Sequence, residues 1–314
     1  MVWTLTKAAA KHIIVSHGLQ GCNFIVAENT KDDLGKAVVY SSKTFSDNAE
    51  FESCLNEIIQ QHSLQKAICS VVMRAGTYSH LLIDKPMVPV KEMAEAIEWL
   101  TKDLVKSLPY ETPLLSHFYG SELLKGKEQN KLHVVVAEQS TVAHYQQLIF
   151  RQGLKLGAMT IEELAIVNML HKASADCAIA YLALCPGKSN SAVFVLNNKL
   201  LGIKRLPSVA LDSASDFSRQ QADFSQLWQG LQQNIEHYLQ SVKKDCPYKV
   251  MLSPCSYSSH AGNSYLGCEA ILQQTFIDAF DTNIEMFDVE NDFYSGPMAK
   301  ELCQKNNILL LGAC

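Results

Sequence analysis

The chain opens with two apolar stretches joined by a glycine-bearing turn, HIIVSHGLQGCNFIVAE (12–28). Short apolar runs on either side of such a turn predict a β-hairpin. GKAVVYSS (35–42) predicts a third strand, and NAEFESCLNEIIQQHS (48–63) has apolar residues at helical spacing. Because the N–H groups of a turn can bind an anion, the first question is whether this hairpin still holds a phosphate.

The rest of the first half alternates further strands and helices. Strands are predicted at KAICSVVM (66–73), YSHLLID (78–84), PLLSHFYG (113–120), LHVVVAE (132–138) and GLKLGAMT (153–160). Helices are predicted from Pro89 to about 105, from Ser140 as N-cap to about Arg151, and over IEELAIVNMLHKA (161–173). This alternation indicates a mixed α/β lobe.

The helix that begins at Pro89 has an apolar stripe. Apolar residues recur there at helical spacing and are expected to face a core: Met93, Ile97, Leu100 and Leu104. Trp99 lies at the margin of this stripe, and we expect it to be buried as well.

The second half repeats the opening pattern. AIAYLALCPGKSNSAVFVLNNKLLGIKRLP (178–207) predicts a strand, a glycine turn, a strand, a tight turn at Asn197 and Asn198, and a third strand. A long amphipathic helix from Phe217 follows, with an apolar stripe that is expected to face the core: Phe224, Leu227, Trp228, Leu231, Ile235, Tyr238, Leu239 and Val242. After it come a strand at YKVMLS (248–253), a helix at 266–280, a strand at NIEMFD (283–288) and a last helical and apolar stretch that ends in ILLLGAC. The sequence therefore predicts two α/β lobes, at residues 1–175 and 176–314.

A β-hairpin that opens each of two α/β lobes is the plan of the actin-like ATPases, which have a ribonuclease H-like fold. In that plan each hairpin offers N–H groups and hydroxyls to nucleotide phosphates, and an acidic residue of each hairpin organises Mg²⁺. Here Ser16 and Cys185 stand where those acids are expected, and neither is a good ligand for a hard cation. The candidates left for phosphate contact are Gly18, Gly21, Gly187, Lys188, Ser189 and Ser191.

We favour the interpretation that both turns are ordinary hairpin turns. The two acids are missing, and so is the glycine pair expected after YKVMLS, where the chain has SPCSYSSHAGNS. A glycine turn alone is weak evidence for a phosphate site. We therefore expect no bound cofactor, and ATP with Mg²⁺ is disfavoured.

The composition is that of a folded protein without a nucleic-acid partner. The 314 residues are 47% hydrophobic and carry a formal net charge of −5, with no Lys/Arg run that would follow a phosphate backbone. No segment has the pattern of a secretory signal or the length that spans a bilayer. We expect the chain to lie in the cytoplasm.

The ten cysteines include no C-x-x-C pair, and several lie inside apolar runs. This usage is typical of reduced, buried cysteines in a cytosolic protein. Cys246, Cys255, His260 and Cys268 form the one cluster worth testing as a metal site, but their spacing does not match structural zinc. We expect no metal.

No catalytic signature stands out. Ser16 next to His17, and His260 among serines, have the residue types of a nucleophile and a base, but no G-x-S-x-G motif surrounds them. Glu162 and Glu163 lie at the predicted start of a helix, where negative charge suits the helix dipole. The sequence therefore predicts a chain that is not an enzyme.

Longer motifs occur in a characteristic order along the chain. They are DKPMVPVKEMAEAIEWLTKDLV (84–105), AMTIEELAIVNML (158–170), the hairpin ending GIKR at Arg205, EHYLQS in the long helix, and the terminal LLLGA. In these motifs, which together span most of the chain, the sequence resembles the MshI proteins of the mannose-sensitive haemagglutinin (MSHA) pilus, relatives of the PilM-like type IV pilus assembly family.

The resemblance implies an actin-like fold with an inserted subdomain at about 43–108, in a component of the pilus machine at the cytoplasmic face of the inner membrane. It also implies docking of the cytosolic N-terminal segment of an inner-membrane PilN-like partner. Such docking requires a groove with apolar anchors, which we expect at the seam between the first subdomain and the inserted one. PilM-like members keep acidic phosphate loops where this chain has Ser16 and Cys185.

The working hypothesis is a non-catalytic adaptor, a pseudo-ATPase that acts through peptide docking. The alternative is an ATP-binding switch or weak ATPase of the same fold, which would hold nucleotide through residues 16–21 and 187–191. A third hypothesis, a relative of the inner-membrane secretion platform with a fused transmembrane helix, is disfavoured because no such helix precedes Cys314.

Overall fold

The computed structural model describes residues 11–18, 21–30, 33–45, 48–170, 177–184, 190–207, 217–242, 247–254 and 284–286. These residues form two units. The first takes in the described residues up to Gly120 and those of Lys127–Ala165, and the second takes in Ser121–Gly126 and the described residues from Ile166 onward.

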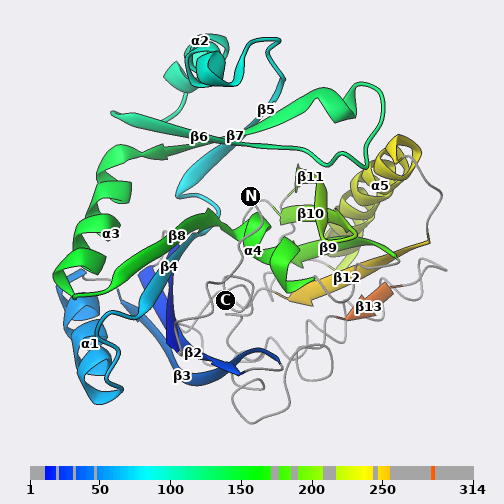
Figure 1. Ribbon diagram of the computed structural model, residues 1–314. Helices are drawn as coiled ribbons and strands as arrows, with labels where there is room; N and C mark the ends of the chain where they lie inside the picture. The colour runs from blue at the N-terminus through cyan, green and yellow to red at the C-terminus, as the bar shows by residue number, and fades with distance from the viewer. Residues whose placement is uncertain are drawn as a thin grey trace. The chain divides into compact units, whose positions relative to one another are not determined.

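The main sheet of the first unit has five strands in the order β3-β2-β1-β4-β8 (Figure 1). β1 and β2 form the predicted opening hairpin, β3 continues it antiparallel, and β4 and β8 run parallel to β1. The strands span Lys11–Gly18 (β1), Gly21–Thr30 (β2), Asp33–Phe45 (β3), Ile68–Met73 (β4) and Lys155–Ile161 (β8).

Two helices, α1 (Asn48–Gln61) and α3 (Gln139–Arg151), pack on one face of this sheet. Alternate residues of β1 and β4 supply the sheet side of the core, and the helices supply the rest: Phe51, Leu55 and Ile59 from α1, and Tyr145, Leu148 and Ile149 from α3.

The predicted N-cap at Ser140 is wrong, because α3 begins at Gln139 and its N-cap is Glu138. The Glu138 carboxylate instead accepts the N–H of Glu111, at 2.8 Å.

A separate three-stranded sheet, the inserted sheet, has the order β5-β7-β6 and is antiparallel throughout. Its strands are β5 (Tyr78–Asp84), β6 (Pro113–Tyr119) and β7 (Lys131–Glu138), and α2 (Met93–Lys106) packs on it after a 3-10 turn at Val90–Glu92. The predicted limits of 43–108 do not coincide with this subdomain. α1 belongs to the core of the main sheet, and β6 and β7 lie beyond 108.

The buried face of α2 differs from the predicted stripe. Met93, Ile97 and Thr101 are buried, whereas Leu100 and Leu104 are 43% and 49% exposed. The prediction that Trp99 belongs to the core is wrong, since Trp99 is 72% exposed. Thr101 can face the core because its hydroxyl donates to the Ile97 carbonyl, at 2.7 Å, within the same helix.

The second unit has its own five-stranded sheet, in the order β11-β10-β9-β12-β13. Its strands are β9 (Ala178–Leu184), β10 (Asn190–Leu196), β11 (Lys199–Leu206), β12 (Tyr248–Pro254) and β13 (Ile284–Met286). β9, β10 and β11 form the predicted antiparallel meander, with Asn197 and Asn198 at φ 49° and 61° in the predicted turn. The predicted helix at 266–280 and the last helical stretch lie outside the described residues.

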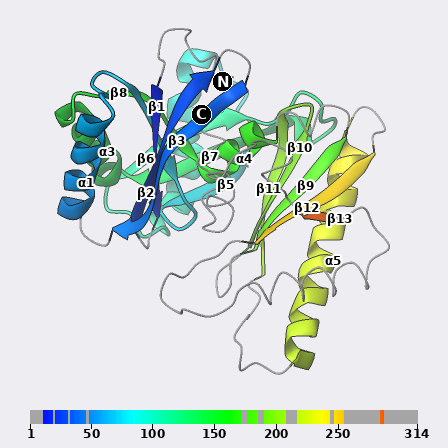
Figure 2. The same cartoon turned by 90° about the horizontal axis from the view of Figure 1, so that it is seen from below.

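The long helix α5 (Phe217–Ser241) runs alongside this sheet (Figure 2). The predicted apolar stripe is confirmed for its described side chains, because Leu227, Trp228, Leu231, Ile235 and Tyr238 are all buried against β9, β10 and β12. Gly202 on β11 makes this packing possible, since a Cβ there would lie 2.0 Å from the Tyr238 hydroxyl.

Within the described residues, no helix combines the length and hydropathy needed to cross a membrane.

The connection between β6 and β7 contributes Ser121–Gly126 to the second unit. Leu124 is 1% exposed in the core under α5 and forms a β-bridge with Val242. The Lys125 N–H donates to the Ser241 carbonyl, at 2.7 Å, and Lys199 pairs with Glu122. The loop of one hairpin is therefore built into the core of the other unit.

Candidate functional site

Gly18 and Gly21 close the first hairpin, where they are register partners at the ends of β1 and β2. Ser16 was expected at the end of its strand, but β1 continues two residues beyond it, and Ser16 pairs with Asn23 and Val72. Ser16 is 3% exposed. A buried hydroxyl supplies one neutral oxygen where Mg²⁺ sites use carboxylates.

In the second hairpin, only part of the predicted phosphate turn is described. Cys185, Gly187, Lys188 and Ser189 lie outside the described residues. Ser191 lies in β10, where it pairs with Ala183 and Arg205 and is 4% exposed. Its hydroxyl has no hydrogen-bond partner within the described residues. The six glycine and polar candidates stay predictions.

The metal candidates Cys246, Cys255, His260 and Cys268 also lie outside the described residues. In the part of the chain that the structure describes, no cluster of His, Cys, Asp and Glu could hold a metal ion. Of the described cysteines, Cys69 is fully buried, and burial raises the pKa of its thiol to about 12. Such a thiol is neutral and unreactive at physiological pH.

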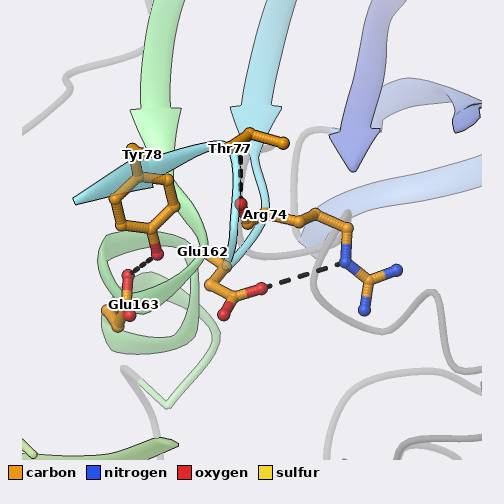
Figure 3. Close-up of polar contacts among 5 residues, drawn as sticks. All are labelled: Arg74, Thr77, Tyr78, Glu162 and Glu163. Atoms are coloured by element: carbon orange, nitrogen blue, oxygen red, sulfur yellow. Dashed lines mark hydrogen bonds and ion pairs between the residues drawn. The ribbon is translucent and has the colours of Figure 1, made fainter. Parts of the chain in front are cut away.

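A polar cluster that the sequence did not reveal lies where β4 and β8 end at the same edge of the main sheet (Figure 3). Arg74 follows β4, and Glu162 begins α4 (Glu162–Met169) directly after β8. The Arg74 Nε lies 3.8 Å from the Glu162 Oε2, and both side chains are about nine-tenths buried, at 10% and 9% exposed. Ligands of open α/β sheets bind at this edge, outside the carboxyl ends of parallel strands.

A second carboxylate of the cluster connects α4 to the inserted sheet. Tyr78, the first residue of β5, donates its phenolic hydrogen to Glu163 (Figure 3). Glu163 is fully buried. The Thr77 hydroxyl donates a hydrogen bond to the Arg74 carbonyl, at 2.7 Å. The predicted helix start at the two glutamates is confirmed, but their burial was missed. The available signal was their position directly after the predicted strand, with no polar loop between.

This cluster is arranged to hold structure together. The charge of Glu162 is opposed by that of Arg74, and Glu163 accepts a hydrogen bond from Tyr78. Buried charges are retained only when they are paired in this way, and removing one partner of such a pair is strongly destabilising. Arg74 therefore opposes the charge of one of the two carboxylates, and Tyr78 hydrogen-bonds the other.

The face of the inserted sheet opposite α2 has a different character. Leu132, Val134 and Val136 of β7 pack with α2, so the alternate residues His133 and Val135 point to the other side. Their register partners His80, Leu82, Ser116 and Phe118 share that side, and so does Leu114, the alternate residue before Ser116 on β6. The set is called here the open face: His80, Leu82, Leu114, Ser116, Phe118, His133 and Val135. Leu82 and Leu114 are 38% and 43% exposed.

Two histidines and a phenylalanine are stacked across the open face. The His133 ring lies between Phe118, with centroids 4.7 Å apart, and His80, with centroids 5.0 Å apart. The His80 Nε2 and the His133 Nδ1 are 2.8 Å apart and share a hydrogen bond. His133 is 2% exposed, and this burial, followed by the proximity of His80, lowers its pKa to about 3.

Comparison of the sequence with known protein families and with curated proteins finds no match. Comparison of the structure with solved structures does find matches. A solved structure described as a PilM-PilN type IV pilus biogenesis complex aligns over 96% of this chain and 96% of its own, with 16% identity and a TM-score of 0.66. A protein of Bacteroides thetaiotaomicron, described as having an actin-like ATPase fold and unknown function, aligns over 100% of both chains, with 9% identity and a TM-score of 0.50.

The fold is that of the actin-like ATPases. The predicted fold class is therefore confirmed, and the hairpins β1–β2 and β9–β10 are the two equivalent openings of an actin-like fold. At these identities the likeness extends to the fold and not to an activity.

The buried histidine makes the stability of the protein depend on pH. In the unfolded chain His133 has its ordinary pKa near 6.5, above its folded value of about 3, so the unfolded state binds more protons at mildly acidic pH. We expect the free energy of unfolding to fall by roughly 2 kcal/mol per such histidine between about pH 7 and about pH 5. His12, whose pKa burial lowers to about 4, adds to this loss.

Urea unfolding of the wild type and of His133→Gln measures the effect. The variant retains a side chain that can hydrogen-bond with His80, and we expect it to lose a clear part of the pH dependence. His237→Gln, an exposed change on α5, is the matched control. A pH dependence that is identical in His133→Gln and the wild type would contradict the assignment.

Proposed function

We propose that this chain is a non-catalytic, MshI-like adaptor of MSHA-type type IV pilus biogenesis. It works at the cytoplasmic face of the inner membrane, where it docks the cytosolic N-terminal segment of a PilN-like membrane partner. The sequence motifs shared with the MshI proteins support this assignment, and so does the structural likeness to the PilM-PilN complex over 96% of both chains.

The observation that carries the proposal is the open face. Leu82 and Leu114 remain 38% and 43% exposed, and Phe118 and Val135 are half-buried between them. Apolar side chains gathered on one flat face give a peptide a set of anchors without charge matching. Large apolar side chains exposed on one face of a folded domain are typical of a binding site.

The two ends of the open face have polar boundaries. At one end the Lys131 Nζ pairs with Asp84, at 2.9 Å, and at the other Tyr78 is hydrogen-bonded to Glu163. An apolar centre with a polar rim is the usual composition of a protein interface. Because the Tyr78 bond fixes one end of β5 to α4, the face is held rigid, which lowers the entropic cost of docking.

The proposal that the chain is not an enzyme and binds no nucleotide is supported by residues in and directly after strands of the main sheet. Phosphoryl transfer needs Mg²⁺ to neutralise developing charge, and Mg²⁺ is held through carboxylate oxygens. The first hairpin has the buried hydroxyl of Ser16 at the expected position, and the carboxylate of Glu162 is paired with Arg74. Both features support the proposal that the chain holds no metal–nucleotide complex.

Peptide binding tests the docking proposal. Isothermal titration calorimetry of the full chain with the N-terminal peptide of the PilN-like partner should show saturable binding. Leu82→Glu places a charge among the apolar anchors, and we expect it to weaken binding at least about tenfold. Val90→Glu is the control, because Val90 is 83% exposed and lies outside the open face.

Both variants change a side chain that already contacts water, so their melting temperatures check that the fold is intact. Absence of any binding by the wild type would reject the docking proposal. Equal affinity of Leu82→Glu and the wild type would place docking elsewhere on the chain.

Thermal unfolding with nucleotide tests the non-catalytic proposal. A ligand that binds the folded state at concentrations about a hundredfold above its Kd adds about 2.7 kcal/mol of stability, which is readily detected. We expect MgATP to leave the melting temperature unchanged. A rise that disappears in Gly187→Val, which adds bulk to the second turn, would instead support the ATP-binding switch.

A further inference from the structure

β6 is an edge strand that lacks the usual protection. It pairs with β7 on one side and, within the described residues, with no strand on the other. Its sequence, PLLSHFY, contains no Lys, Arg, Asp or Glu, and its pairing with β7 is free of bulges. Proteins normally place charges or bulges on open edges because an unprotected edge pairs with another chain.

The register shows which groups of β6 are available. The Gln139 N–H donates to the Thr112 carbonyl, at 2.9 Å, immediately before the first β6–β7 pair. In an antiparallel ladder the N–H and C=O of one residue point to the same side, and successive residues alternate. The residues whose groups point toward β7 are therefore Leu114, Ser116 and Phe118, and those that point to the open edge are Pro113, Leu115, His117 and Tyr119.

The position of the proline agrees with this assignment. Pro113 has no N–H, and it falls in the set that points away from β7, where the ladder needs no donor. The open edge therefore retains three N–H donors and four carbonyl acceptors in a strand of 7 residues.

We propose that two copies of this chain pair through β6, antiparallel, about a two-fold axis at Ser116. The two inserted sheets then form one continuous sheet. In this register the outward groups of Leu115 meet those of His117 in the second copy, so donors face acceptors on both sides of the axis. The proposal goes beyond peptide docking and does not rest on it.

The side chains favour a second copy over another partner, because β6 is complementary to itself in this register. On the open face, Leu114 of each copy lies opposite Phe118 of the other. On the α2 face, Pro113 lies opposite Tyr119, a residue that is 48% exposed. Apolar and aromatic cross-strand pairs stabilise a sheet, and no charged residue of the strand meets its own copy.

The symmetry also limits the assembly to two copies. A two-fold pairing uses the same edge of both partners and leaves no free β6 for a third chain. The paired strands are short, so the buried area falls in the range of weak, transient interfaces. We therefore expect an equilibrium between monomer and dimer that depends on protein concentration.

Ser116 provides a sharp test, because it is the one residue that lies opposite itself. Ser116 is exposed, and its side chain can be changed without removing a backbone donor. Sedimentation velocity of the full chain should show dimer that grows with concentration. Ser116→Lys and Ser116→Asp each place like charges across the axis, and we expect each to raise the dimer dissociation constant about fivefold.

Mixing the two variants should restore dimerisation, because a lysine then faces an aspartate. Fusing one variant to a mass tag identifies the mixed dimer. Gln61→Lys, an exposed change at the end of α1, is the control and should dimerise as the wild type does. A wild type that stays monomeric at every concentration, or dimers that Ser116→Lys does not weaken, would overturn the proposal. If the mixture forms no more dimer than either variant alone, the proposed register is overturned.

Discussion

One helix can bury only one face of a sheet, and among the described residues α2 is the helix that packs on the inserted sheet. α2 packs on Leu132, Val134 and Val136, and the other face keeps apolar side chains in partial contact with water. The central His133 of that face is buried by stacking between Phe118 and His80 rather than by a second helix. The candidate docking surface and the neutral buried histidine both follow from this one-sided covering.

The polar cluster next to this sheet gives the open face a fixed support. Tyr78 and Glu163 join the start of β5 to α4, and Arg74 and Glu162 join the end of β4 to the same helix. Desolvating two charges is expensive and is offset only by good pairing, so such clusters are better suited to fixing one arrangement than to adding stability. At the carboxyl edge of the main sheet, these contacts tie the inserted sheet and β4 to α4. This arrangement supports the proposal of an adaptor that acts through its shape.

Much of the fold could be predicted because local patterns determined it. Apolar runs bounded by turns predicted the hairpins, Asn197 and Asn198 predicted their turn, and the stripe of α5 predicted the burial of Trp228. Periodicity failed at Trp99, because a helix on a sheet of three strands buries a narrow face and spacing alone does not say which residues form it. The bond between Tyr78 and Glu163 joins residues 85 positions apart, so no local spacing could predict it.

The central claim is that a partner segment lies on the open face. The most direct measurement is photo-cross-linking of the full chain with the partner peptide carrying a diazirine leucine, read by mass spectrometry. The account predicts adducts on β5 and β6, at Leu82, Leu114 or Phe118, and their loss with excess unlabelled peptide. Adducts confined to the exposed residues of α2, such as Trp99, or to the β1–β2 hairpin would contradict it.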